Sequence, residues 1–151
     1  MKEFGSVDEI MDFAVAREEE AAQFYADLAG RAERAWMRQV FEGFAREELG
    51  HKAKLLTIKE EKLLMPAADK VMDLKIADYL VEAEPAADMN YQDALVLAMK
   101  REKASFKLYT DLAATTDDAN LRATLLALAQ EEARHKLRFE LEYDDYVLKE
   151  D

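Results

Sequence analysis

Apolar residues recur every three or four positions along most of the chain, which is the spacing of one face of an α-helix. The first and third helical stretches begin at Ser6 and Asn90, residue types that commonly cap helices. The second is predicted to end at Pro66, because proline cannot continue a helix. The pattern predicts an all-α fold with four long helices, over about residues 6–30, 34–65, 90–114 and 117–147.

The segment over about residues 66–89 lies between the two predicted helix pairs and contains both prolines of the chain. It is too short and too mixed in composition to form a domain, so we interpret it as a crossover connection. We therefore expect a single domain over residues 1–151. Five residues of the crossover are predicted to lie against the bundle: Val71, Leu74, Ile76, Tyr79 and Leu80.

The two helix pairs are related by an internal repeat, in which a residue of the first pair has its counterpart 84 positions later. Two similar helical hairpins joined by a long crossover predict a four-helix bundle. The matching residues include Glu18 with Glu102, Tyr25 with Tyr109, Glu48 with Glu132, and His51 with His135.

Carboxylates and imidazoles interrupt the apolar stripe in the middle of every predicted helix. The central glutamate of each predicted helix lies 15 residues from the turn of its hairpin, if the hairpins turn near Glu33 and Asp117. Equal distances from the turns place the four glutamates at one level of an antiparallel bundle. Buried carboxylates need a cation or protons to compensate their charge. The six residues of this predicted layer are Glu18, Glu48, His51, Glu102, Glu132 and His135.

The composition of this layer indicates a metal site. A glutamate followed three residues later by a histidine places both side chains on one helix face, where they can bind one metal. Four carboxylates with two imidazoles suit iron or manganese, and two divalent ions balance four carboxylates. One glutamate from each of two helices and Glu-x-x-His from each of the others is the layout described for ferritin-like di-metal proteins. We therefore predict two divalent metal ions, iron or manganese, as cofactors.

Composition excludes several other classes of protein. The chain has 33 acidic and 21 basic residues, a formal net charge of -12, and no cysteine. The absence of cysteine excludes disulfides, iron–sulfur clusters and thiol nucleophiles within this sequence. Four glycines and two prolines are too few for a β-fold with many tight turns. The negative charge disfavours nucleic acid and anionic lipid. With no signal-like N-terminus and no long apolar run, a cytoplasmic protein without a membrane partner is expected.

The sequence resembles the rubrerythrin type of the ferritin-like superfamily over nearly its whole length. The resemblance implies a ferritin-like bundle in which Glu48 and Glu132 bridge two irons. It also implies that Tyr25 and Tyr109 take part in the site by hydrogen bonding to ligand carboxylates of neighbouring helices. The family reduces peroxide or reacts with dioxygen, and its members commonly form homodimers. The remaining implied ligands are Glu18 with His51 for one iron, and Glu102 with His135 for the other.

Two departures from rubrerythrin change the expected function. Rubrerythrin carries a rubredoxin module with four cysteine ligands, and this sequence has no cysteine. Electrons are therefore expected from a separate donor, such as a rubredoxin-like protein. Ser105 stands where rubrerythrin has an additional glutamate, and this favours a more symmetric, ferroxidase-like centre. We expect Ser105 to be a small core residue.

The leading hypothesis is a di-iron oxidoreductase of the peroxidase or ferroxidase type. The alternative is a non-catalytic protein that binds or sequesters iron or manganese, and a third interpretation is a helical scaffold with a vestigial site. Glu47 and Glu131 lie one turn before the two histidines and would be placed to orient them. A solvated helix face is nevertheless the expected position for both glutamates.

Overall fold

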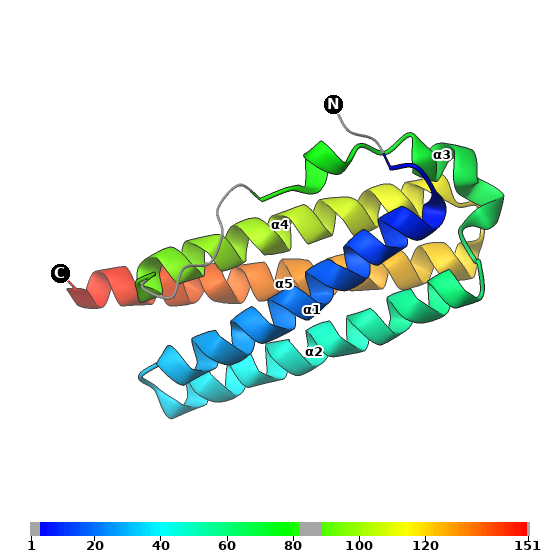
Figure 1. The fold of residues 1–151 in the computed structure, drawn as a ribbon. Helices are drawn as coiled ribbons and strands as arrows, with labels where there is room; N and C mark the ends of the chain where they lie inside the picture. Colours follow the sequence, from blue (N-terminus) through cyan, green and yellow to red (C-terminus); the bar gives the residue numbers. More distant parts are fainter. Residues whose placement is uncertain (1–3, 82–88, 151) are drawn as a thin grey trace.

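Four long helices form an elongated bundle in the computed structural model, which describes residues 4–81 and 89–150 (Figure 1). Their apolar stripes face inward, as the sequence pattern predicts, and the described residues contain no strand. The expected all-α fold is confirmed. The four helices are α1 (Val7–Arg31), α2 (Ala35–Glu60), α4 (Tyr91–Thr115) and α5 (Ala119–Glu150).

The helices pair as two hairpins, α1 with α2 and α4 with α5, whose turns lie at opposite ends of the bundle (Figure 1). The backbones approach each other far more extensively within each hairpin than between the hairpins. The two hairpins are therefore held together mainly by side chains that fill the space between them. The connection between them contains η1 (Met65–Ala67), α3 (Ala68–Met72) and η2 (Ile76–Tyr79).

Side-chain caps start three of the long helices. The hydroxyl of Ser6 accepts a hydrogen bond from the backbone N–H of Glu9 at 3.1 Å. The side-chain oxygen of Asn90 accepts one from the N–H of Asp93 at 2.7 Å, and Asp118 caps α5 in the same way. Each cap satisfies a backbone donor that has no partner inside its helix. The predicted starts of the first and third helices are confirmed.

The end of α2 differs from the prediction. The helix ends at Glu60 rather than near Pro66, because Lys62 adopts a left-handed conformation with φ of 55°. The N–H of Leu63 bonds to the carbonyl of Ile58 at 3.1 Å, which is the backbone pattern of a Schellman motif. The turn directs Leu64 into the core, where it is buried. A lysine carries little sequence signal for this conformation, which glycine usually adopts.

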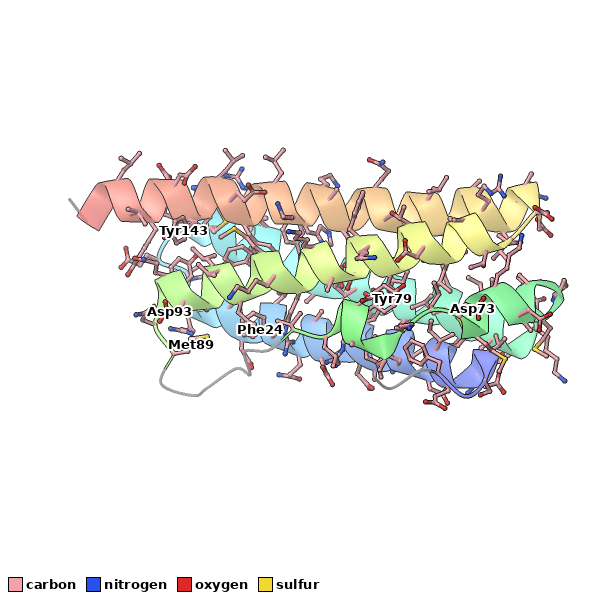
Figure 2. All side chains as sticks on the ribbon, turned by 90° about the horizontal axis from the view of Figure 1, so that it is seen from above. Phe24, Asp73, Tyr79, Met89, Asp93 and Tyr143 are labelled. Atoms are coloured by element: carbon pink, nitrogen blue, oxygen red, sulfur yellow. The ribbon has the colours of Figure 1, made fainter. Side chains whose placement is uncertain are left out.

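The crossover packs along the bundle through most of its predicted apolar residues. Val71 and Tyr79 are buried, and Leu74 and Ile76 pack against the same apolar cluster. The Tyr79 hydroxyl donates to Asp111 of α4 at 2.8 Å, and Figure 2 shows this part of the crossover alongside α4. The prediction for Leu80 is wrong, because its side chain is 50% exposed. The backbone is extended there, so neighbouring side chains point in opposite directions.

Two apolar clusters fill the bundle on either side of its middle. One combines the first half of α1 with the second half of α4 and the crossover. The other combines the second half of α1 with the first half of α4 and the start of α2. This arrangement places the two hairpins antiparallel to each other and leaves a separate layer between the clusters.

We expect Lys62→Gly to stabilise the protein by about 0.5–1 kcal/mol, because glycine adopts the left-handed conformation without the steric cost that lysine carries. Chemical denaturation would measure the change in the free energy of unfolding. Lys54→Gly, at an exposed position inside α2, is the matched control and should destabilise the protein by about 1 kcal/mol. A destabilised Lys62→Gly variant would contradict the role of the left-handed turn.

Candidate metal centre

The structure brings all six predicted ligand residues together between the two apolar clusters. Each of the four long helices contributes, and α2 and α5 each contribute a glutamate and a histidine one turn apart. No residue of the set is more than 2% exposed. The set consists of Glu18, Glu48, His51, Glu102, Glu132 and His135.

The six residues form two overlapping groups of potential ligands. Within each group, one ligand atom per residue lies within 4.8 Å of the others. Glu48 and Glu132 belong to both groups, so their carboxylates lie between the two positions where a metal can bind. The first group adds Glu18 and His51, and the second adds Glu102 and His135.

The two imidazoles direct their Nδ1 atoms toward the carboxylates. Nδ1 of His51 lies 2.8 Å from Oε1 of Glu132 and 3.4 Å from Oε2 of Glu18. Nδ1 of His135 lies 3.1 Å from Oε1 of Glu48. The two rings are nearly parallel, with 9° between their planes and centroids 6.4 Å apart. Both histidines thus present equivalent nitrogens to the same layer.

The outward nitrogens of the histidines contact the two glutamates that were expected on a solvated face. Nε2 of His51 lies 2.5 Å from a carboxylate oxygen of Glu131, and Nε2 of His135 is hydrogen-bonded to Glu47. These glutamates are only partly exposed, at 38% and 36% for their side chains. The expectation is therefore wrong. Each glutamate orients the histidine of the other hairpin, a pairing that spacing within one helix does not reveal.

The contact between each Nε2 atom and its glutamate decides which imidazole nitrogen can bind a metal. A carboxylate accepts a hydrogen bond, so the proton of each neutral imidazole lies on Nε2 and leaves a lone pair on Nδ1. Burial lowers the pKa of His51, but the carboxylates of Glu18 and Glu131 outweigh that effect and raise it above its usual value. In the metal-free site the same carboxylates favour a second proton, which a metal at Nδ1 would displace.

Tyr25 and Tyr109 lie within the layer and hydrogen-bond across the bundle. The hydroxyl of Tyr25 donates to Glu102, and that of Tyr109 donates to Glu18. Burial, followed by the nearby glutamates, raises the pKa of both phenols well above its ordinary value. Both phenols therefore stay protonated at neutral pH and act as hydrogen-bond donors. The structure thus contains the hydrogen bonds that the resemblance implies.

Unpartnered atoms show that the donor set fits a metal. In the described part of the chain, and with both imidazoles neutral, each of the six residues has one fully buried side-chain atom without a hydrogen-bond partner. Buried polar atoms without partners are rare and costly in proteins. Carboxylate oxygens and imidazole nitrogens that share this property and converge are ligands that a divalent cation satisfies. The atoms are Oε2 of Glu18 and Glu102, Oε1 of Glu48 and Glu132, and Nδ1 of His51 and His135.

The glutamates of this layer cannot all be ionised without a compensating charge. Burial is the largest cause that raises the pKa of Glu48 and Glu132 well above its ordinary value, and the charges of neighbouring glutamates add to it. Protons therefore neutralise part of the layer in the metal-free protein. Two divalent cations would supply the same compensation.

The surroundings of the two histidines are not equivalent. The ring of Phe44 stacks on His135, with centroids 4.0 Å apart, and Arg134 holds Glu47 at 2.8 Å. The residues that the repeat places at the corresponding positions near His51 are Leu128 and Gly50, which offer neither an aromatic ring nor a charge. Burial raises the pKa of Glu47, but hydrogen bonds from His135 and Arg134 outweigh it and lower the pKa. The six potential ligands are therefore symmetric, whereas the residues around the two histidines are not.

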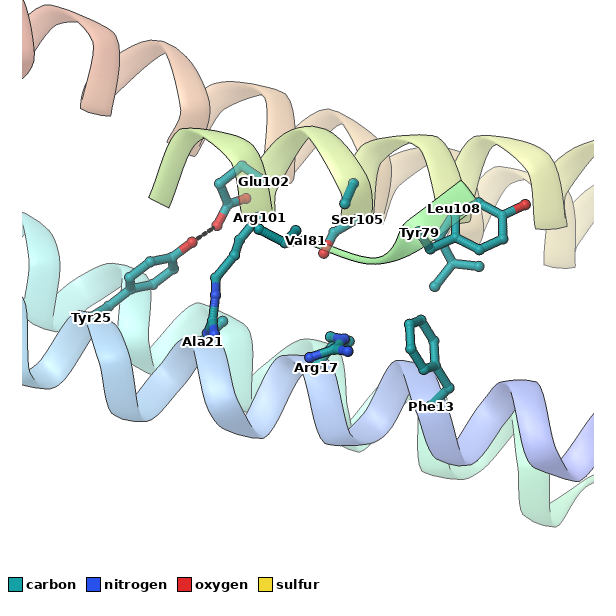
Figure 3. Close-up of a pocket in the computed structure, with 11 residues that line it drawn as sticks. Phe13, Arg17, Ala21, Tyr25, Tyr79, Val81, Arg101, Glu102, Ser105 and Leu108 are labelled. Carbon is teal, nitrogen blue, oxygen red and sulfur yellow. Dashed lines mark hydrogen bonds between the residues drawn. The ribbon is translucent and has the colours of Figure 1, made fainter. Parts of the chain in front are cut away.

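Ser105 does not fill the core as expected. It is half-buried and lines a cleft between α1 and α4, together with Tyr25 and Glu102 at the inner end (Figure 3). The small side chain stands at the wall of this cleft and leaves space instead of filling the core. The cleft also contains Arg17 and Arg101, which the sequence pattern did not single out. The two arginines are 84 positions apart, which is the offset of the repeat, and this match could have identified them from the sequence.

The comparisons with known proteins agree with this architecture. The rubrerythrin family model matches residues 9–143, so the chain belongs to the rubrerythrin family. A crystal structure of a candidate ferritin-like diiron-carboxylate protein from Thermotoga maritima has a TM-score of 0.79 at 20% sequence identity. The match covers 97% of this chain and 99% of that chain, and it shows a common fold. The predicted ferritin-like architecture is confirmed. A search of curated proteins finds no match.

We expect the metal-free protein to lose stability as the pH rises above the unfolded glutamate pKa of about 4.3, because the pKa of Glu48 and of Glu132 is raised in the folded protein. Carboxyl groups with a raised pKa bind more protons in the folded than in the unfolded state, so their contribution is complete below the unfolded pKa and is lost through the folded pKa. Thermal unfolding with a chelator would measure this slope. Glu48→Gln combined with Glu132→Gln should flatten it, and parallel slopes for variant and wild type would contradict the buried-charge argument.

We expect Glu47→Gln and Glu131→Gln each to weaken metal binding by about 10- to 100-fold, because the histidine facing each one loses the carboxylate that orients it. Anaerobic titration with Fe²⁺ would measure the affinity. Glu42→Gln, an exposed glutamate of α2, removes the same charge without touching the site and should bind like wild type. If all three variants bind metal equally well, these contacts do not position the histidines.

Proposed function

We propose that this chain is a di-iron oxidoreductase that reduces hydrogen peroxide or dioxygen with electrons from a separate donor. The observation that carries the proposal is the pair of buried ligand groups that share Glu48 and Glu132. Membership of the rubrerythrin family and the fold shared with a candidate diiron-carboxylate protein support it.

The proposed ligand assignment follows the two groups. Glu18 and His51 would hold one metal, Glu102 and His135 would hold the other, and Glu48 and Glu132 could contribute to both. Carboxylate and imidazole ligands favour iron or manganese over copper(I). Iron bound there supplies electrons to a reaction that converts one hydrogen peroxide to two water molecules with two electrons and two protons.

The protein's own residues orient the ligands and limit access. Tyr25 and Tyr109 keep their protons and hold the carboxylates of Glu102 and Glu18 in place. The apolar clusters above and below the layer exclude water along the bundle axis. The cleft between α1 and α4 reaches Tyr25 and Glu102 from the side (Figure 3), and we propose it as the route for a small oxidant.

The electron donor and the assembly are parts of the proposal that rest on the sequence. These 151 residues contain no cysteine and therefore no rubredoxin-type iron site, so we propose a separate, rubredoxin-like donor. The homodimer also remains a proposal, for which the exposed Leu137 and Leu141 of α5 offer an apolar surface. A cytoplasmic location and the absence of a nucleic-acid partner stay predictions. Within the described residues, no helix is both long and apolar enough to cross a membrane.

The proposal predicts that the purified chain binds about two iron ions and that the anaerobically reduced, iron-loaded protein consumes hydrogen peroxide or dioxygen. With peroxide, one molecule should be consumed for every two Fe²⁺ ions oxidised. Metal analysis and stopped-flow optical spectroscopy would measure both. Glu48→Gln with Glu132→Gln should lose metal and activity together, because both bridging ligands are removed, whereas Glu42→Gln should retain both.

Three outcomes separate the hypotheses. Two metals per chain with consumption of either oxidant supports the oxidoreductase, and the preferred oxidant separates peroxidase from ferroxidase activity. Two metals per chain without reaction toward either oxidant favours iron or manganese sequestration, the alternative that the acidic composition supports. Well under one metal per chain after anaerobic loading favours a scaffold with a vestigial site.

A further inference from the structure

We propose that the cleft between α1 and α4 binds a small planar carboxylate-type anion, such as formate or bicarbonate, between the guanidinium groups of Arg17 and Arg101. The proposal goes beyond the metal and the oxidant, because it assigns a separate ligand to the space beside them. Only the dependence on metal described below rests on the proposed function.

The cleft has a size that limits the ligand. It extends inward to the hydrogen-bonded pair Tyr25 and Glu102, and Ser105 forms part of its wall (Figure 3). The space open to the centre of a water-sized molecule is about 20 Å³. A single water needs about 10–15 Å³ by this measure, so the cleft admits a ligand of only a few heavy atoms.

The internal repeat explains why two arginines meet here. Arg17 and Arg101 occupy equivalent positions in the two hairpins, and each directly precedes a predicted ligand glutamate. Ala21 and Ser105 are equivalent as well. Both arginines line the same cleft between α1 and α4. In Figure 3 the side chain of Arg101 extends from α4 toward Ala21 of α1, and the guanidinium group of Arg17 lies in the same gap.

Both guanidinium groups have donors that no protein carboxylate uses. Among the described residues, Arg101 has no ion-pair partner, and its guanidinium group lies 5.4 Å from the ring centroid of Phe24. Arg17 contacts Glu20 through Nη1 at 2.7 Å and leaves its remaining N–H groups without an acceptor in the described structure. The planar, forked donors of a guanidinium group match the two oxygens of a carboxylate, and Ser105 adds a hydroxyl donor.

The charges around the cleft favour an anion over a neutral molecule. Of the residues that line it, only Glu102 is acidic, against two arginines. A second hollow on the surface adjoins the cleft, since Val81 and Ala104 line both. Lys100, Lys103 and Lys107 line that hollow with one acidic residue, Asp78, and Lys107 also pairs with Asp111 at 3.0 Å, so the hollow carries a net positive charge. In a chain of net charge -12, this basic surface attracts small anions toward the mouth of the cleft.

Metal and anion should help each other to bind. The carboxylate of Glu102 at the inner end repels an anion in the metal-free protein, and a cation bound to that carboxylate reduces the repulsion. The coupling is reciprocal, so a bound anion increases metal affinity by the same factor. Anion affinity is therefore higher in the metal-loaded protein.

Equilibrium titration with ¹³C-formate, followed by NMR in metal-free and zinc-loaded protein, tests the proposal without measuring turnover. Three heavy atoms limit the expected Kd to about millimolar or weaker. Arg101→Gln should weaken binding about tenfold or more through loss of a charge-assisted contact. Arg46→Gln, an exposed arginine of α2 outside the cleft, is the matched control and should leave binding unchanged. Formamide has the shape of formate without the charge and should not bind.

Ser105→Glu provides a second variant, one that keeps both guanidinium groups. It places a tethered carboxylate in the cleft, so it should abolish formate binding while circular dichroism shows the same helix content. A parallel titration with ¹³C-bicarbonate separates the two ligands, and binding of either with the Arg101 dependence supports the site. No binding up to about 100 mM, equal binding in Arg101→Gln, or equal binding of formamide would overturn it.

Metal analysis of the same samples keeps the two proposals apart. Protein that holds two metals per chain and binds no formate overturns the anion site alone. Formate binding that depends on Arg101, in protein that holds no metal after loading, supports the anion site and overturns the di-iron function.

Discussion

The burial of four glutamates at one level of the bundle is the constraint on which the rest of the structure depends. Each is at most 1% exposed, in an interior where an uncompensated carboxylate is strongly disfavoured. The surrounding residues compensate only in part. Tyrosine hydroxyls occupy one oxygen of Glu18 and of Glu102, and the histidines approach the shared pair, Glu48 and Glu132. The remaining lone pairs converge without partners among the described residues, and this makes the layer a candidate site for divalent cations.

The internal repeat organises this layer through reciprocal contacts between the hairpins. Tyr25 reaches Glu102, and its counterpart Tyr109 reaches Glu18. The same exchange joins each histidine to the outer glutamate of the other hairpin. These polar contacts join the two hairpins at the level of the layer, and the apolar clusters join them on either side of it. The symmetry is not complete, since the surroundings of His135 include Phe44 and Arg134, which have no equivalent in the other half of the repeat.

Prediction from the sequence succeeded where a signal is periodic or repeated. The four long helices, the two side-chain caps and the six residues of the polar layer are visible as spacing along one chain. The predictions that were wrong concern positions where the local backbone conformation or the packing of neighbouring helices determines the outcome. A lysine in the left-handed conformation ends α2 early, and an extended backbone turns Leu80 outward. Ser105 lines a cleft between the hairpins, and the residue type alone does not show whether a neighbouring helix fills that space.

The sequence by itself determined the fold class and the composition of the site. A helix places residues three or four positions apart on one face, and the repeat places the polar residues of all four helices at one level of the bundle. Only the tertiary structure decided the pairings across the bundle. Glu47 orients His135 rather than the histidine one turn along its own helix, and Arg17 and Arg101 converge on one cleft. Such pairings depend on how the helices are rotated and spaced against one another, and packing of the whole bundle sets that geometry. The spacing within any one helix carries no record of it.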